Sequence, residues 1–489
     1  MNQPSIPFRT TSHEGIRMRD PMRELALLTS YHKWSKLDVP VFIPANEKRR
    51  VPLNERVVRG FSLPLNKDSA AARSLSLPAC ALALAMGADV RFEPMNDTPV
   101  HRSYPSPRSL FPVDVCLIFS QDGHELRLAY DETHHALLHN PLASLSKSLD
   151  GWELRIQLAC ALDKIAPLYG DLAISLCAFE IGHLTHQICA ALNSLGVPFQ
   201  CYMLAAPEPE NLSSRLGHSV PLVDIVLEKQ RYIRPAEEDF KDLLRVSVYS
   251  LNEADWGRVQ RGSGWAASPA SSPRIIHPAG RNCEFPLQRT AGSCHRSSGN
   301  FRTGKHGRPA SDSELDVLIT SILEDYRASS KGQSLRPTLT VLRTHPNFDV
   351  TVMRESEQTP KEVVAKGCIP LSEAYGTFYN IDMQTIPLVI VFTADFGALM
   401  KEESSWSYIE MLVLTGVYSQ RVCNQAAMRG FVARPFKGVK EDVLETAFNL
   451  SGQCFYTILL GKSNEDNPAL SVNSLRIKTR HNQLAGERP

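Results

Sequence analysis

The sequence has no long apolar run, no excess of charge of one sign and no closely spaced cysteine pair. No stretch reaches the roughly 18 uninterrupted apolar residues of a membrane helix. The formal net charge of +1 gives no reason to expect binding to nucleic acid or to a membrane. Residues 1–20 lack the apolar core of a signal peptide, and the 11 cysteines include no Cys-x-x-Cys motif. We therefore expect a cytoplasmic protein with reduced core thiols.

Several sequence motifs of common enzyme classes are missing as well. There is no Gly-x-x-x-x-Gly-Lys-Ser/Thr loop, no Gly-x-Gly-x-x-Gly fingerprint and no Gly-x-Ser-x-Gly elbow. His183 and His186 are spaced so that both imidazoles could lie near one helix face and bind zinc. No cysteine or carboxylate set accompanies them at ligand spacing. We therefore expect histidines of the core or of a polar seam, and no metal.

The composition is that of a globular protein with more than one domain. Of its 489 residues 43% are hydrophobic and 21% charged, which suits two or three cores. Residues 252–312 are rich in Gly, Ser, Pro and basic residues, and they separate two halves. The predicted division is an N-terminal extension (1–55), a first lobe (56–215), a connecting segment (216–285), a second lobe (286–465) and a C-terminal tail (466–489).

Both lobes show the same order of predicted elements. Each begins with two strands that form a hairpin, continues with a third apolar strand and ends in a long apolar helix. In the first hairpin Asp122 and Gly123 supply a strong turn signal. The predicted strands are 113–119, 125–130 and 154–159 in the first lobe, and 338–344, 349–354 and 387–392 in the second.

The two predicted helices, 172–195 and 408–428, are apolar on nearly every side and must therefore be buried. Gly182 and Gly416 interrupt them, and a second glycine ends each helix after the same spacing. A glycine inside a helix costs about 1 kcal/mol relative to alanine, so close helix packing or a nearby ligand is expected there. The matched spacing predicts an internal repeat, in which the two lobes form an intramolecular pseudo-dimer.

The first lobe carries a motif that is similar to a known family. In HRSYPSPRSLFPVDVCLIF (101–119), Arg102, Pro105, Ser106 and Pro112 keep the spacing of Arg-x-x-Pro-Ser-Gly-Gly-Ala-Leu-Tyr-Pro before an apolar strand. Glu180 and Gly182 stand where that family has Glu-Thr-Gly. The segment resembles SagB-type dehydrogenases, the azoline oxidases of the FMN-dependent nitroreductase superfamily.

The second lobe resembles the same superfamily more weakly. RSSGNF (296–301) resembles its Arg-Ser-x-x-x-Phe motif, and residues 412–436 resemble its glycine helix and the loop after it. The resemblance implies an α+β fold with two nitroreductase-like lobes. Each lobe would be a mainly antiparallel sheet wrapped by helices around a long central helix. In the superfamily FMN lies between two subunits, so here it would lie between the lobes.

The resemblance also implies where FMN would bind. Its phosphate needs guanidinium and hydroxyl donors, and its ring lies close to a backbone turn in which glycine permits contact. The first lobe has Pro107 and Arg108 in place of the two glycines of that turn, whereas the second lobe retains one. The candidate cofactor residues are Arg296, Ser297, Asn300, Ser330, Gly332, Arg434 and Ser106.

The same family implies a catalytic base near the start of the glycine helix. There a Lys-Tyr pair removes a proton from the azoline ring while the flavin accepts a hydride, and oxygen then reoxidises the flavin. Lys401 and Tyr408 lie near this position in the second lobe, and Lys164 and Tyr169 lie there in the first. We predict Lys401, Tyr408 and Tyr169 as catalytic residues, since a buried lysine can act as a base and a tyrosine as a proton relay.

The predicted function is an FMN-dependent oxidase or dehydrogenase of natural-product biosynthesis. Its substrate would be a thiazoline or oxazoline ring on a peptide or a carrier protein, which it converts to a thiazole or oxazole. The first alternative is a non-catalytic scaffold subunit of the same fold in a biosynthetic complex. The second alternative is a general nitro- or quinone-reductase that uses NAD(P)H.

Overall fold

The structure is a computed structural model, and it describes about half of the chain. The described residues are 56–60, 78, 81–82, 85–86, 89–92, 100–107, 110–121, 124–131, 136–139, 153–204, 219–227, 274–276, 310–331, 333, 335–345, 349–354, 369–375, 386–396, 399, 405–462 and 470–473.

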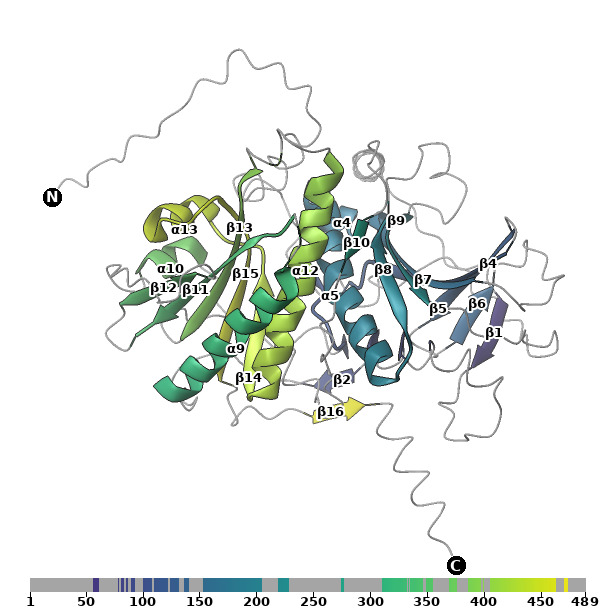
Figure 1. Ribbon diagram of the computed structural model, residues 1–489, viewed down its shortest axis with the longest axis horizontal. Helices are drawn as coiled ribbons and strands as arrows, with labels where there is room; N and C mark the ends of the chain where they lie inside the picture. The colour runs from purple at the N-terminus through teal and green to yellow at the C-terminus, as the bar shows by residue number, and fades with distance from the viewer. Residues whose placement is uncertain are drawn as a thin grey trace, which may run out of the picture.

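The larger of the two main sheets belongs to the first half of the chain (Figure 1). Its strands are β1 (Arg56–Gly60), β4 (Val113–Gln121), β5 (His124–Asp131), β6 (Ala136–His139), β7 (Glu153–Ala161), β8 (Phe199–Met203), β9 (Ser219–Leu227) and β10 (Arg274–Ile276). They lie in the order β1-β6-β5-β4-β7-β9-β8-β10, and every neighbouring pair is antiparallel.

The second half of the chain forms a five-stranded antiparallel sheet. Its strands are β11 (Thr338–Thr344), β12 (Val350–Arg354), β13 (Leu388–Ala394), β14 (Phe431–Phe436) and β15 (Gln453–Lys462). They lie in the order β12-β11-β13-β15-β14. The predicted hairpins, β4–β5 and β11–β12, are confirmed, as are the third strands, β7 and β13.

The two lobes share one topology. In the first sheet five neighbouring strands lie in the order β5-β4-β7-β9-β8, and the strands of the second sheet lie in the order β12-β11-β13-β15-β14. When the two orders are matched position by position, the matched strands also follow each other in the same sequence along the chain. Even the irregularities correspond, because the register shifts between Leu158 and Ala159 in one sheet and between Phe392 and Thr393 in the other. A chance match of strand order would not reproduce the position of this shift.

The helices separate and cover the sheets (Figure 1). They are α4 (Ala166–Tyr169), α5 (Ala173–Ser194), α9 (Asp312–Ser330), α10 (Ile369–Tyr375), α12 (Ser405–Met428) and α13 (Glu441–Phe448), with short 3-10 turns η2 (Leu162–Lys164) and η3 (Gly170–Leu172). The central pair α5 and α12 lies side by side between the two sheets, and α9 packs against α12. Helices α10 and α13 cover the outer face of the second sheet through a separate apolar cluster.

The two central helices cross where both carry a glycine. A Cβ atom on Gly182 would lie 2.0 Å from the carbonyl oxygen of Val413, and one on Gly416 would lie 2.1 Å from that of Phe179. No side chain fits between backbones this close, so close helix packing is the reason for both glycines. Nearly all of α5 is buried, and one apolar cluster continues through both lobes, as the apolar helices predicted.

A third, small antiparallel sheet connects the end of the described chain to the first half. Strand β16 (Leu470–Asn473) pairs with β2 (Asp89–Phe92), which in turn pairs with β3 (Val100–His101). Strand β16 lies in the segment predicted as a C-terminal tail, and β9 lies in the predicted connecting segment although it occupies the middle of the first sheet. The domain boundaries therefore remain a prediction from the sequence.

Two further expectations concern thiols and membranes. The seven cysteines of the described segments are all buried, as predicted for core thiols: Cys116, Cys160, Cys177, Cys189, Cys201, Cys423 and Cys454. Of the helices in these segments, none combines the length and the apolar character needed to cross a bilayer.

Candidate functional site

The turn before β4 is the part of the first lobe that resembles the flavin-contacting turn. Ser106 lies in it, fully enclosed, and its hydroxyl donates to Glu180 Oε2 of α5 at 2.7 Å. The same serine oxygen accepts from the backbone N–H of Phe111 at 2.9 Å. Phe111 has a positive φ of 51°, an uncommon conformation for a bulky residue. The turn is thus held in shape by its own contacts to α5.

Aromatic and cationic side chains fill the space around this first turn. The guanidinium carbon of Arg102 lies 3.7 Å from the centre of the Phe111 ring, a close cation–π contact. Arg102 Nη1 also donates to the hydroxyl of Tyr104 at 2.8 Å, and the rings of Tyr104 and Phe111 meet edge to face at 6.1 Å. All three side chains are buried. The first turn is therefore closed by packing.

The corresponding turn of the second lobe follows α9 and has a different construction. The backbone N–H of Gln333 donates to the carbonyl of Ser330 at 3.2 Å, and Lys331 has φ −61° and ψ 124°. These angles are those of the first central residue of a type II turn, which calls for glycine next, and the sequence has glycine there. The buried Ser330 hydroxyl accepts from Arg336 Nη1 at 2.7 Å instead of meeting a carboxylate.

Gln333 presents a buried polar group beside this second turn. Its Oε1 accepts from the hydroxyl of Tyr418 of α12 at 2.6 Å, which fixes the plane of the carboxamide. Its Nε2 is buried and has no hydrogen-bond partner. A buried amide donor without a partner costs about 1–3 kcal/mol, so such an atom in a folded protein calls for an explanation.

A hydrogen-bonded polar seam joins the central helices across the lobes. His183 Nδ1 of α5 lies 2.9 Å from Gln420 Oε1 of α12, and His183 Nε2 lies 3.2 Å from the hydroxyl of Tyr456 of β15. Since a carbonyl oxygen can only accept, Nδ1 donates to Gln420 Oε1. Tyr456 in turn stacks on Phe179 with ring centres 4.1 Å apart. His183 thus connects both lobes.

The seam continues along the same helices. Asn424 Nδ2 donates to His186 Nε2 and to Gln187 Oε1, both at 3.1 Å. The carbonyl of Ser103 accepts from Gln187 at 2.8 Å and from Gln420 at 3.2 Å, one donor from each central helix. The predicted polar-seam role of the two histidines is therefore confirmed. In the described segments no group of three or more potential ligands is arranged to hold a metal ion.

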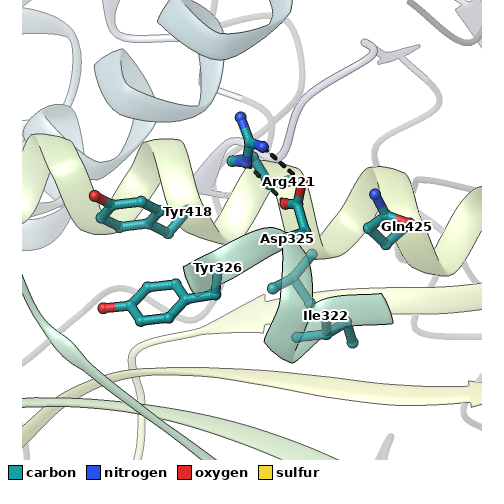
Figure 2. Close-up of a pocket in the computed structure, with 7 residues that line it drawn as sticks. Ile322, Asp325, Tyr326, Tyr418, Arg421 and Gln425 are labelled. Carbon is teal, nitrogen blue, oxygen red and sulfur yellow. Dashed lines mark hydrogen bonds and ion pairs between the residues drawn. The ribbon is translucent and has the colours of Figure 1, made fainter. Parts of the chain in front are cut away.

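A narrow pocket without room for a water molecule lies between α9 and α12 (Figure 2). Figure 2 shows the bidentate ion pair of Arg421 with Asp325, whose N···O distances are 2.8 and 2.6 Å. The rings of Tyr326 and Tyr418 lie beside each other, with centres 4.9 Å apart. Tyr418 therefore connects this pocket to the turn that carries Gln333.

The predicted catalytic tyrosines are both buried. Tyr408 near the start of α12 is 3% exposed, and its ring meets that of Phe396 edge to face at 5.4 Å. Tyr169 at the end of α4 is 8% exposed. Lys164, the alternative base of the first lobe, forms an ion pair with Asp114 at 2.5 Å. Although burial alone would raise the pKa of Asp114, Lys164 and Ser219 together lower it, so this carboxylate stays charged beside the lysine.

The remaining predicted site residues fall into two groups. Arg434 lies half-buried on β14, with its guanidinium carbon 5.7 Å from the ring centre of Phe436. Ser330 and Ser106 lie in the turns described above. Five candidates lie outside the described residues: Arg296, Ser297, Asn300, Gly332 and Lys401. Ser106 donates to Glu180 and Ser330 accepts from Arg336, so the two serines have different partners.

The sequence motifs do not single out Gln333, Tyr418, Gln420 or Asn424. A usable signal was present for the last two, because polar residues that interrupt a helix apolar on every side must find buried partners. Gln333 follows the glycine of the second turn, and this position could have been noted as one close to a candidate ligand.

Comparison with known proteins identifies a structural relative but no relative by sequence. No family model matches the sequence, and no curated protein matches it. Among solved structures the chain is similar to a "putative nitroreductase" from Anabaena variabilis, with a TM-score of 0.61 and 13% identity over 91% of this chain and 99% of that chain. The chain therefore has a nitroreductase-like α+β fold with two lobes, and the predicted fold class is confirmed.

Proposed function

We propose that the chain is an FMN-dependent oxidoreductase that oxidises a thiazoline or oxazoline ring carried by a peptide or a carrier protein. One observation carries the flavin assignment. Two lobes of equal topology pack through the glycine crossing of α5 and α12, within a nitroreductase-like fold. The azoline substrate rests on the SagB-type motif of the first lobe. We also propose that both lobes arose from one repeated unit, which the matching register shifts support.

The residues between and beside the lobes fit a flavin at one of the two turns. A flavin ring carries carbonyl oxygens at its edge, which would accept hydrogen bonds from donors such as Gln333 Nε2. Ser330 lies in the same turn. Arg434, the residue predicted for the phosphate, lies half-buried on β14 beside Phe436, on the face of the sheet that α10 and α13 cover. When bound, FMN supplies the acceptor of a hydride.

The chain itself must supply the base that takes a proton from the substrate ring. The ammonium group of Lys164 is held by the charged carboxylate of Asp114, so it is a poor base. Lys401 and Tyr408, which precede and begin the glycine helix of the second lobe, remain the proposed base and relay. A buried Tyr408 would pass a proton without exposing the site to water.

The test begins with an absorbance spectrum of freshly purified protein and an assay for FMN released on denaturation. We expect near-stoichiometric FMN, and loss of it in Arg296→Ala. Under anaerobic conditions an azoline peptide should bleach the flavin, and air should restore the colour. Protein that is colourless and takes up no added FMN would end the enzyme proposal. Steady turnover of NAD(P)H with a nitroaromatic, without reaction with azolines, would instead identify a general reductase.

A non-catalytic scaffold subunit of a biosynthetic complex is the second candidate. Two observations favour it. Arg102 and Phe111 pack against each other at the first turn, and Lys164 forms an ion pair with Asp114 and so does not act as a base. A scaffold would copurify with biosynthetic partners while containing no flavin. The flavin assay therefore separates the two proposals directly.

A further inference from the structure

We infer that the polar seam between the lobes is an acid-sensitive contact, which holds while His186 is neutral and weakens when this histidine takes up a proton. The seam joins α5 of the first lobe to α12 of the second around the backbone carbonyl of Ser103, and His186 is fully buried in it. The inference concerns the contact between the lobes and no ligand, so it does not depend on the proposed function.

One backbone carbonyl sets the direction of the hydrogen bonds in this part of the seam. The Ser103 carbonyl can only accept, and it lies 2.8 Å from Gln187 Nε2 and 3.2 Å from Gln420 Nε2. Turning either carboxamide over would place two oxygens against each other. Gln420 Nε2 also donates to Asn424 Oδ1 at 3.0 Å, which leaves Nδ2 of Asn424 as the donor on its other side.

Asn424 therefore presents its N–H groups to His186. Its Nδ2 lies 3.1 Å from His186 Nε2 and 3.1 Å from Gln187 Oε1. An amide nitrogen does not accept, so His186 Nε2 is the acceptor and carries no hydrogen. A proton added there would face the amide N–H, and turning Asn424 over would set its oxygen against Gln187 Oε1. A buried charge without an acceptor is costly, so protonation favours separation of the two helices.

His183, one turn earlier on α5, does not have this conflict. Its Nδ1 donates to Gln420 Oε1, and its Nε2 lies 3.2 Å from the hydroxyl of Tyr456, which can accept as well as donate. A proton added to His183 would therefore find an acceptor at either nitrogen. Of the two histidines of the seam, His186 is the one whose protonation the seam opposes.

The charged side chains of the central helices near His186 are Glu180 and Arg421. Glu180 lies about 9 Å before it along α5 and accepts from the Ser106 hydroxyl at 2.7 Å. Arg421 points to α9, where Asp325 holds it in a bidentate ion pair (Figure 2). Each of the two charges is thus engaged by a different element.

The other titratable groups around the seam are a guanidinium and two thiols. Arg102 precedes Ser103 and donates to the hydroxyl of Tyr104 at 2.8 Å, and a cation in this turn would oppose a second positive charge. Cys189 and Cys423 are buried thiols of the two central helices. Thiols ordinarily lose their proton only above about pH 8, so they do not change charge in the acid range.

The test is unfolding of the full chain in urea, followed by circular dichroism at several pH values. An imidazole in water takes up a proton near pH 6.5, so stability from the seam is present above about pH 6.5 and lost below it. Lowering the pH from about 7.5 to about 5 should raise the unfolding constant by about thirtyfold through His186 alone. His186→Gln places a permanent acceptor, Oε1, opposite Asn424 and should remove this factor.

Asn424→Asp makes the opposite prediction and serves if His186→Gln does not fold. A carboxylate at this position accepts from a protonated Nε2, so the folded chain would then favour the charged histidine. The ratio of the unfolding constants at about pH 5 and 7.5 should be at least about thirtyfold lower than in the unaltered chain. His345→Gln is the control, since Nε2 of this half-buried histidine bonds to the Thr351 hydroxyl, and it should keep the pH dependence of the unaltered chain.

Two results would overturn the inference. One is the same pH dependence in His186→Gln as in the unaltered chain, and the other is an unchanged pH dependence in Asn424→Asp. Either result would mean that the folded chain accepts a proton at His186 without loss of stability. The test needs neither FMN nor a substrate, so its outcome is independent of the flavin assay.

Discussion

Replacing Gly182 by alanine tests the close helix crossing most directly. The new Cβ would lie 2.0 Å from the carbonyl oxygen of Val413, whereas ordinary van der Waals contact begins at 3.4 Å. The obstacle is backbone, so the helices must separate by more than an ångström. That shift would lengthen the 2.9 Å hydrogen bond from His183 to Gln420 beyond the range of hydrogen bonding.

The magnitude follows from three contributions. Overpacking of a core costs about 1–3 kcal/mol, and each buried hydrogen bond lost from the seam costs about 1–3 kcal/mol more. The better helix propensity of alanine returns about 1 kcal/mol. We therefore expect Gly182→Ala to lower the free energy of unfolding by about 2–5 kcal/mol. Gly416→Ala, whose Cβ would lie 2.1 Å from the carbonyl oxygen of Phe179, should cost a similar amount.

The assay is chemical denaturation followed by far-UV circular dichroism. Gly196→Ala is the matched control, because Gly196 has a φ of +69° and a Cβ placed on it would meet nothing within 4 Å. Its cost should be conformational strain alone, about 1–2 kcal/mol. The double variant Gly182→Ala/Gly416→Ala should cost less than the sum of the single variants, since helices already apart accept the second methyl group. A Gly182→Ala protein as stable as the unaltered chain would refute the reasoning.

Two further predictions concern helix α9. Hydrogen bonds from the backbone of Ser311 and from Lys462 lower the pKa of Glu314 to about 2, so its contribution to stability is present above about pH 4.5 and is lost as the pH falls towards 2. Glu314→Gln should flatten the pH dependence of unfolding in that range, and an unchanged acid profile would contradict this. Asp325→Ala leaves the buried guanidinium of Arg421 without its carboxylate and should cost about 1.5–3 kcal/mol in denaturation, against little for the exposed Asp316→Ala.

The sequence allowed the framework to be predicted because local patterns specify it. Alternating apolar residues around Asp122-Gly123 predict a hairpin, and the observed strands pair from Gln121 and His124 outward. The central helices were predictable because they are apolar on every side, and a glycine at the same place in both indicated a close approach. The hairpin depends on residues that are neighbours along the chain. The helix glycines stand out because the same pattern occurs in both halves of the sequence.

The candidate site was harder to predict from the sequence, because its contacts join residues that lie far apart in the sequence. Which side chain of α12 faces His183 depends on the crossing of two helices, and no local pattern indicates that Gln420 is its partner. Likewise, the glycine of the second turn was visible, but the orientation of Gln333 depends on Tyr418 from another helix. Family patterns selected Ser106, whose hydroxyl the structure places against Glu180.

The return of β16 to the first lobe has a consequence for how the molecule folds and evolves. Its strand comes from the chain beyond the second lobe and completes a sheet with β2 of the first, while one apolar cluster runs through both lobes. Neither half would keep all its strand partners if it were expressed alone. The halves should therefore melt in one cooperative transition. Under the proposed duplication, one lobe is free to lose its function, because its packing against the other lobe keeps both folded.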